Sequence, residues 1–169
     1  MKTEELRGLQ APIKAKYREQ PESAIITHKA EGEIGQNITC KVETGRALVE
    51  AGLHPASGGT GLFMCSGDML LEALVGCAGV TMGSVATAIG IELKSGKVRA
   101  EGDVDYKGTM AVSKEVPVGF KAIRLYFDLE TDATEEQIQI LAKLTERYCI
   151  VYQTLVKGVS VETSYHQKS

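Results

Sequence analysis

Two stretches of the chain alternate apolar and polar residues, and two others are rich in β-branched residues. Apolar positions recur at every second residue in 98–106 and in 123–129, which is typical of strands with one buried face. The segment 107–119 between them carries turn residues near its end, so we expect an antiparallel pair with a broad connection. Earlier in the chain, 24–27 and 37–42 flank a polar segment and predict a β-hairpin.

A long apolar segment between these strand regions predicts a central helix. Met69–Ile89 is apolar on nearly every side, which indicates a helix that is buried in the middle of the structure. Ser66 is a suitable N-cap, Asp68 falls in the first turn where the helix dipole favours an anion, and Gly90 is placed to end the helix.

The C-terminal third predicts a second helix and a final strand. Thr134 followed by Gln137 forms a capping box, and the helix that begins there runs up to Cys149. Its apolar stripe consists of Ile138, Leu141, Leu144 and Tyr148. A short helix is predicted over Val151–Val156, before Gly158. The alternating residues Val159, Val161 and Tyr165 predict the last strand.

The order of these elements predicts the fold class and the domain organisation. Strands, a long helix, strands, a second helix and a strand form an α+β arrangement rather than alternating βαβ units. Residues 1–22 are polar and predict an N-terminal arm with a short helix near Thr3–Leu9. The rest, 23–169, is predicted to form a single domain.

Composition narrows the classes of function and the compartment. A net charge of −3 over 169 residues gives no electrostatic reason to expect nucleic acid or a membrane surface as a partner. The first residues contain no apolar core of a secretory signal, so we expect a cytoplasmic protein. The uncharged run Ala73–Ile89 is short for a membrane span, and we interpret it as part of the buried helix.

The four cysteines are the residues with the most distinctive chemistry. No two of them form a C-x-x-C motif and no histidine pair accompanies them, so we expect neither zinc nor another cofactor. In a reducing compartment they are expected to remain thiols. Cys40 lies on a predicted strand and is interpreted as structural, whereas Cys65 precedes the helix cap and is expected to be the most accessible thiol.

Cys77 and Cys149 each leave two interpretations open. Cys77 lies deep in the apolar helix, where burial alone raises the pKa of a thiol, so reactivity requires a cation or a donor from elsewhere in the fold. By periodicity alone Cys77 is a core residue. Beside Cys149, Arg147 either lowers the pKa of the thiol across a break in the helix or lies exposed at the helix C-terminus.

Other candidates for chemistry carry weaker signals. The turn-rich segment Gly52–Gly61 lacks the Gly-Lys-Ser/Thr ending of a phosphate-binding loop and is expected to cover another part of the fold. Asp103 and Asp105 share a strand face, which is typical of a solvated edge. Three histidines are widely separated and none is paired at metal-ligand spacing: His28, His54 and His166.

Two cysteine-containing segments resemble the signatures of the OsmC/Ohr family. Ser66–Cys77 reads SGDMLLEALVGC, follows Gly58-Gly59, and resembles the carboxylate-led ELLLAAL-x-x-C helix that carries the family's first cysteine. Glu146–Leu155 reads ERYCIVYQTL and is similar to the second signature, YCPVS-x-x-L. The order of elements agrees with the family over roughly residues 24–163.

The resemblance implies a fold, a partner and a mechanism. Family members are homodimers in which two antiparallel sheets wrap around long central helices, with two active sites at the subunit interface. By this resemblance the chain is a cysteine-based peroxidase of organic hydroperoxides. Cys77 would become a sulfenic acid, Cys149 would resolve it as a disulfide, and a small dithiol or a dithiol protein would restore both thiols.

Three departures place the chain in a divergent branch of that family. The peroxidase members hold their thiolate with an Arg from an early strand or turn, but Glu31–Gln36 contains no Arg and the next one is Arg46. The carboxylate position ten residues before the first cysteine is Gly67, with Asp68 beside it, and Ile150 replaces a common proline. Two other functions therefore remain open: an OsmC-like dimer that binds a small apolar ligand at its interface without peroxidase activity, and a structural dimerisation domain with incidental cysteines.

Overall fold

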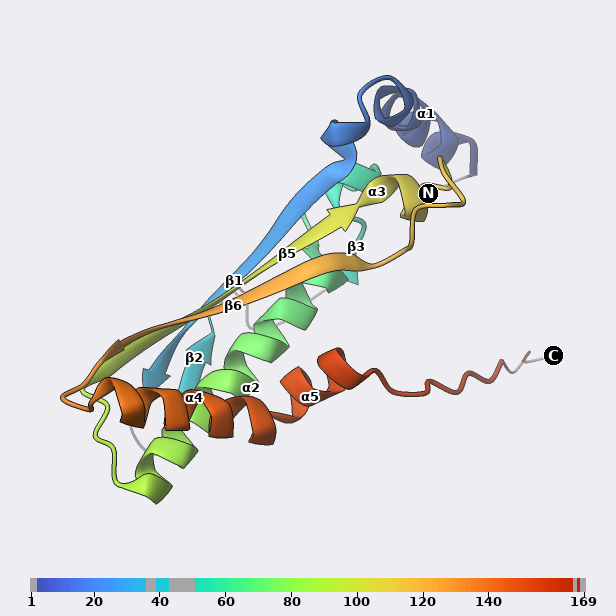
Figure 1. The fold of residues 1–169 in the computed structure, drawn as a ribbon. Helices are drawn as coiled ribbons and strands as arrows, with labels where there is room; N and C mark the ends of the chain where they lie inside the picture. Colours follow the sequence, from blue (N-terminus) through green and yellow to red (C-terminus); the bar gives the residue numbers. More distant parts are fainter. Residues whose placement is uncertain (1–2, 36–38, 43–50, 166, 168–169) are drawn as a thin grey trace.

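A four-stranded antiparallel sheet carries helices on one face, as the computed structural model shows (Figure 1). The structure describes residues 3–35, 39–42, 51–165 and 167. The sheet has the order β2-β1-β5-β6, with β1 at Ile25–Gly35, β2 at Thr39–Val42, β5 at Ser95–Asp105 and β6 at Phe120–Glu130. Short parallel strands β3, Ala51–Gly52, and β4, Met64–Cys65, form a second sheet. The predicted α+β class is confirmed.

The predicted strand pairs have the expected register and burial. β1 and β2 form the hairpin, and β5 pairs antiparallel with both β1 and β6. Along β5, Val98 and Ala100 are buried while their neighbours are more exposed, which is the predicted alternation. At the end of the strand Val104 and Asp105 are both buried. Gly102 is required on this strand because a Cβ there would lie 2.4 Å from the ring of Phe120.

The central helix α2, Ser66–Ile89, is buried on one side only. The N-cap of α2 is Cys65, whose backbone is extended. The N-cap therefore lies one residue before Ser66, which the sequence predicts as the cap. Gly90 ends the helix in the left-handed region, with φ of 73°, as predicted. Val80 is 38% exposed in the single chain, and the large residues that share this partial exposure are Met69, Leu70 and Ile89. The prediction of burial on every face is therefore wrong for one chain.

The buried side of α2 forms the core of the fold. It packs against β1, β5 and the helices α4, Glu135–Tyr148, and α5, Ile150–Lys157. The length and apolar character of α2 would suffice to cross a membrane, but these same features belong here to a core helix. The capping box of Thr134 and Gln137 is present at the start of α4, where each side chain bonds the other residue's backbone amide.

The N-terminal arm is a longer and better packed helix than the sequence predicts. α1 spans Thr3–Glu19 and is followed by a 3-10 turn, Pro21–Ala24, instead of ending near Leu9. Tyr17 is buried, and its hydroxyl donates to the carbonyl of Ala56 at 2.6 Å. Ala56 lies in the 3-10 turn Pro55–Ser57, so the turn-rich loop covers the end of the sheet next to α3, Tyr106–Thr109.

The predicted final strand does not form in the single chain. Residues 158–165 have no regular structure, and the segment runs away from the rest of the molecule (Figure 1). Val161 is 80% exposed and Val159 is also largely exposed. A strand is stable only beside another strand that pairs its backbone groups. In the described part of the chain, residues 158–165 do not pair with the sheet.

Candidate functional site: a pair of thiols between helices

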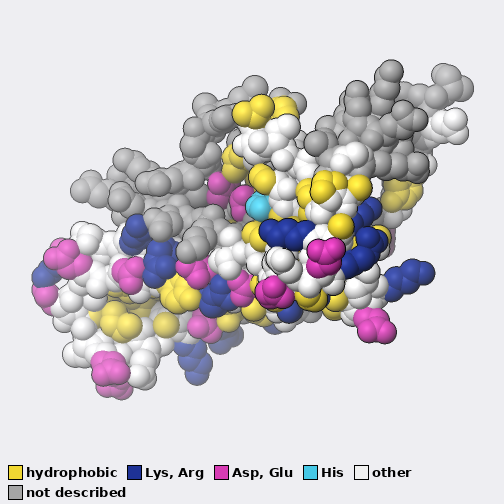
Figure 2. Space-filling model, turned by 90° about the horizontal axis from the view of Figure 1, so that it is seen from above, with side chains coloured by type: hydrophobic (Ala, Val, Ile, Leu, Met, Phe, Trp, Pro, Cys, Tyr) yellow, Lys and Arg dark blue, Asp and Glu magenta, His cyan; other side chains and the backbone are white. Residues whose placement is uncertain are grey.

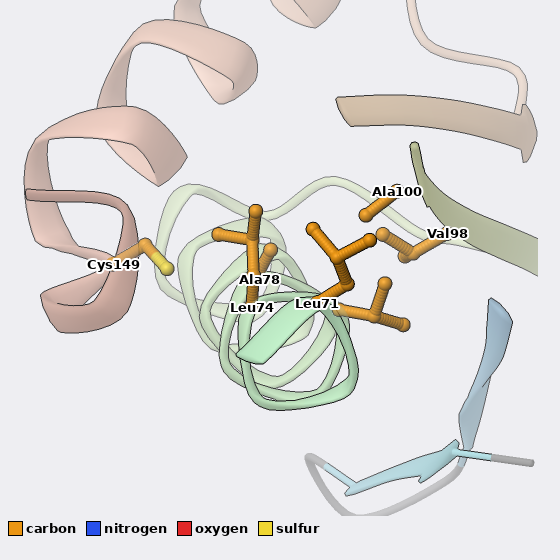
Figure 3. Close-up of a cluster of buried hydrophobic side chains, with 7 residues drawn as sticks. Leu71, Leu74, Ala78, Val98, Ala100 and Cys149 are labelled. Carbon is orange, nitrogen blue, oxygen red and sulfur yellow. The ribbon is translucent and has the colours of Figure 1, made fainter. Parts of the chain in front are cut away.

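Cys77 and Cys149 come from distant parts of the sequence and meet in the core. Cys77 lies near the middle of α2, and Cys149 lies between α4 and α5. Both are free thiols, and Cys77 lies close enough to Cys149 to raise the pKa of its thiol. Figure 3 shows Cys149 leaving the α4–α5 junction with its sulfur directed toward α2. The structure therefore brings together the two cysteines that the sequence singles out.

The chain turns sharply at Cys149, and this turn holds its sulfur in place. Cys149 is both the last capping residue of α4 and the N-cap of α5, with an extended backbone at ψ 107°. Its amide donates to the carbonyl of Thr145 at 2.9 Å, which closes α4. Its Sγ accepts from the amide of Tyr152 at 3.5 Å, which opens α5. The sulfur takes the role that a Ser or Asp oxygen usually has at an N-cap.

Burial sets the protonation preference of Cys149. Its side chain is 1% exposed, and this burial raises the pKa of the thiol above its ordinary value. The amides of Tyr152 and Val151 act in the opposite direction, because they stabilise a negative sulfur. The nearby Cys77 thiol also raises the pKa. Cys149 is therefore held as a protonated thiol close to Cys77.

The two sulfurs have different access to solvent. Cys149 belongs to a buried cluster with Leu71, Leu74, Val75, Ala78, Val98 and Ala100 (Figure 3). Cys77 packs against the edge of this cluster and remains partly exposed, on the less buried side of α2. A small reagent can consequently approach Cys77 more easily than Cys149.

A groove borders the same cluster. It has a volume of about 790 Å³ and lies between β6 and the helices α2, α4 and α5. Leu74, Tyr152 and Leu155 line it and also pack in the cluster of the two cysteines. Its walls are mainly apolar, and its charged lining residues are Lys121 on β6 and Glu146 on α4. No local sequence pattern predicts this groove, because four separate elements contribute its walls.

Arg147, the cation that the sequence places beside Cys149, has a structural role. Arg147 lies over the ring of Tyr148, with its guanidinium carbon 5.5 Å from the ring centroid. It is in the last turn of α4, where a cation complements the helix dipole. Although the helix does break at Cys149, the interpretation of Arg147 as an exposed C-terminal residue agrees with this contact. Arg46, the other candidate, lies outside the described residues.

The arginines of the sheet are engaged by carboxylates on its outer face. Arg124 binds Asp103 through two hydrogen bonds, which together with the hydroxyl of Thr27 lower the pKa of Asp103 to about 2. Arg99 lies over the ring of Tyr126, 4.6 Å from its centroid. Acidic and basic side chains are interspersed on the face seen in Figure 2. Asp105, in contrast, is buried and caps α3, so the two aspartates do not act as a pair.

Cys65 lies in a second cluster, which sequence reasoning missed. Its thiol lies close to the hydroxyl of Tyr106, whose ring stacks on His54 at 5.2 Å between centroids. Tyr106 is buried, and burial together with the nearby Cys65 and Asp68 raises the pKa of its hydroxyl well above the ordinary value. Cys65 is half-buried, as Cys77 is, so the prediction that it is the most accessible thiol is not confirmed.

The remaining candidates do not form a metal site in the described part of the chain. No group of three or more His, Cys, Asp or Glu side chains is close enough there to hold a metal ion. His54 caps the turn at Pro55, where its Nδ1 accepts from the amide of Ala56 at 3.0 Å. His166 lies outside the described residues, as does the side chain of Cys40, although its backbone lies on β2 as predicted.

Comparisons with known proteins agree with this architecture. The family model of OsmC-like proteins matches residues 59–164, a range that includes both cysteines of the pair. The fold is similar to the crystal structure of an OsmC-like hydroperoxide resistance protein from Jannaschia sp. CCS1. That match has a TM-score of 0.56 and 18% identity, and covers 86% of this chain and 94% of the other. No curated protein sequence matches the chain.

Proposed function

This chain belongs to the OsmC-like family, and from that premise we propose that it is a cysteine-based peroxidase that reduces organic hydroperoxides. The observation that carries the proposal is the meeting of Cys77 and Cys149 in one core cluster, where Cys77 lies close enough to raise the pKa of the Cys149 thiol. Two thiols that lie close together can form a disulfide once their Cβ atoms approach to about 4 Å. The crystal structure from Jannaschia sp. CCS1 is described as a hydroperoxide resistance protein, which is consistent with this activity.

The unequal environments of the two thiols assign their roles. The Cys77 thiolate attacks the outer oxygen of the peroxide ROOH, the O–O bond breaks, and the alkoxide takes a proton to leave as ROH. Cys77 is then a sulfenic acid. The Cys149 thiol attacks this sulfur, water leaves, and a Cys77–Cys149 disulfide remains. The partly exposed Cys77 meets the peroxide, and the buried, protonated Cys149 lies close to it as the resolving thiol.

The catalytic cycle needs a reductant and a compartment that keeps thiols reduced. A small dithiol or a dithiol protein exchanges with the Cys77–Cys149 disulfide, becomes a disulfide itself and returns both cysteines to thiols. The three described cysteine side chains are all free thiols. A cytoplasmic location is part of the proposal, because the cytoplasm maintains such a reducing poise.

A second copy of the chain is proposed to complete the site. The half-buried Cys77 lies on the incompletely covered side of α2, where Val80 and Met69 are exposed. Exposed apolar residues grouped on one helix side indicate a contact surface. A homodimer that packs these sides together would exclude water from the thiol pair. Val80→Lys should then shift sedimentation equilibrium from dimer to monomer, and a wild-type protein that sediments as a monomer would contradict the dimer.

The direct test is a stoichiometric titration of the reduced protein with cumene hydroperoxide. One equivalent should consume two thiols, and non-reducing peptide mapping should find a Cys77–Cys149 disulfide. Cys65→Ser is the matched control, since Cys65 is half-buried like Cys77 but lies in the other cluster. Slow oxidation, or oxidation scattered over several cysteines, would reject the peroxidase.

The groove supports a second candidate function, the binding of a small apolar ligand without turnover. Its apolar walls and its volume of about 790 Å³ are typical of ligand sites. The test is the binding of a fluorescent fatty acid such as cis-parinaric acid to the reduced protein. Binding that is weakened by Leu155→Asp, in a protein that does not consume peroxide, would favour this function over the peroxidase.

A further inference from the structure

The break between α4 and α5 interrupts several backbone hydrogen bonds of a continuous helix, and the carbonyl of Glu146 is one of the acceptors concerned. In an uninterrupted helix the carbonyl of Glu146 would accept from the amide four residues later, at Ile150. Because the chain turns at Cys149, that bond is not available. The side chain of Gln153 replaces it: its Nε2 donates to the carbonyl oxygen of Glu146 at 2.8 Å. Gln153 thus ties the second turn of α5 to the last turn of α4.

We propose that Gln153 is a positioning residue for the thiol pair, because its side-chain amide fixes the angle at which α5 leaves α4. That angle keeps the Cys149 sulfur, which accepts from the Tyr152 amide, directed toward α2 and close to Cys77. The inference deepens the proposed function and rests on it for its consequence in turnover. Its consequence for the stability of the disulfide follows from the geometry alone.

α5 depends on such a tie because its own packing is weak. It has eight residues, and none of them is buried. Ile150 and Val156 are largely exposed, while the apolar contacts of α5 come from the half-buried Val151, Tyr152 and Leu155. Isolated helices of this length are unstable in water, so α5 keeps its place only through contacts with its surroundings. A hydrogen bond across the junction restricts the directions in which α5 can swing.

The consequence concerns how readily the two thiols form a disulfide. Cys149 lies at the junction, so a freer α5 lets its sulfur sample orientations away from Cys77. The effective concentration of one thiol near the other then falls. Loss of one hydrogen bond should lower the equilibrium constant for disulfide formation by about threefold to tenfold. The sequence motif does not identify Gln153, because its role depends on the break at Cys149.

The experiment equilibrates the full-length protein with glutathione and glutathione disulfide at pH 7. In this exchange the protein dithiol gives two electrons and two protons, and glutathione disulfide becomes two glutathione molecules. Non-reducing peptide mapping then quantifies the Cys77–Cys149 disulfide. The variants are Gln153→Leu, which keeps the volume and removes the donor, Gln153→Glu, which places a carboxylate against the carbonyl, and Gln153→Lys, which restores a donor. Thr154→Ala is the matched control, since Thr154 is an exposed neighbour on α5.

The expected order of equilibrium constants separates positioning from a general structural role. Gln153→Leu and Gln153→Glu should fall about threefold to tenfold, whereas Gln153→Lys and Thr154→Ala should stay within about twofold of wild type. A Gln153→Leu value within twofold of wild type would overturn the proposal, as would an equal loss in Thr154→Ala. If Gln153→Leu does not fold, the comparison of Gln153→Glu with Gln153→Lys decides. No peroxide is involved, so a failed peroxidase assay leaves this test intact.

Discussion

Two cysteines on the same helix have contrasting neighbours. Cys65 caps the start of α2 and Cys77 lies twelve residues later, about 18 Å along the helix axis. Both are half-buried, and each lies close to a titratable side chain. For Cys65 that neighbour is the hydroxyl of Tyr106, which cannot form a bond to an oxidised sulfur under mild conditions. For Cys77 it is a second thiol. The chemistry of each site is set by the neighbour rather than by exposure.

Substitution of each cysteine should separate the two sites most clearly in turnover. With cumene hydroperoxide and a dithiol reductant, Cys77→Ser should lose activity by a factor on the order of a thousand or more, because serine is not a nucleophile toward peroxide at neutral pH. Cys65→Ser should stay within about twofold of wild type. The measurement is kcat/KM from steady-state peroxide consumption. Equal losses in both variants would mean that the contrast between the two cysteines has no catalytic meaning.

The core around Cys149 should be the more sensitive region in stability. Leu74 is fully buried and packs both in the cluster of the two cysteines and along the groove. Leu74→Ala should lower the free energy of unfolding by about 2–5 kcal/mol through the cavity that it leaves. Lys143→Ala, on the exposed side of α4, should change it by less than about 0.5 kcal/mol. Urea denaturation measures both, and a loss below 1 kcal/mol for Leu74→Ala would contradict this view of the core.

The sequence predicts those features of the two cysteine regions that depend on local interactions, and it misses those that depend on tertiary contacts. The alternation in β5 and the capping box of α4 are local patterns, and both are confirmed. The pairing of Cys77 with Cys149 came from two short motifs and their order, since spacing alone favoured a core thiol. Tyr106 was missed as a neighbour of Cys65, because its contact depends on how α3 closes over the start of α2.

Two of the wrong predictions have the same physical cause. Val159 and Val161 have the alternation of a strand, but local preference cannot supply the neighbouring strand that they need. The apolar sides of α2 predicted complete burial, yet a single chain covers only one of them. Both patterns predict a surface against which to pack, and neither states whether the same chain provides it. The proposed dimer would account for both.

Two substitutions of Cys149 should separate its role as the N-cap of α5 from its role as the resolving thiol. The expected change in stability is smaller than that for Leu74→Ala. Cys149→Ser keeps an N-cap acceptor for the Tyr152 amide, whereas Cys149→Ala removes it. We expect Cys149→Ala to be about 1 kcal/mol less stable than Cys149→Ser. Both variants lack the resolving thiol, so Cys77 should be over-oxidised to the sulfinic acid in each, as intact mass after peroxide treatment would show. Protection of Cys77 in either variant would place the resolving thiol elsewhere.

The smallest expected effect is a difference in alkaline stability between the two sites. In both, folding raises a pKa: that of the Cys149 thiol and that of the Tyr106 hydroxyl, each mainly through burial. A raised pKa in the folded state means that the unfolded chain releases its proton first, so stability is complete below the unfolded pKa and is lost as pH rises above it.

For the thiol this loss should begin near pH 8.5, and for the phenol near pH 10, the ordinary pKa values of the two groups. Cys149→Ser should therefore flatten the decline in unfolding free energy above pH 8.5, and Tyr106→Phe should flatten it only above pH 10. Urea denaturation between pH 7 and pH 11 measures both slopes. If both variants flatten the decline in unfolding free energy over the same pH range, the two sites do not differ in their electrostatics. The contrast between Cys65 and Cys77 then rests only on the identity of the neighbouring side chain.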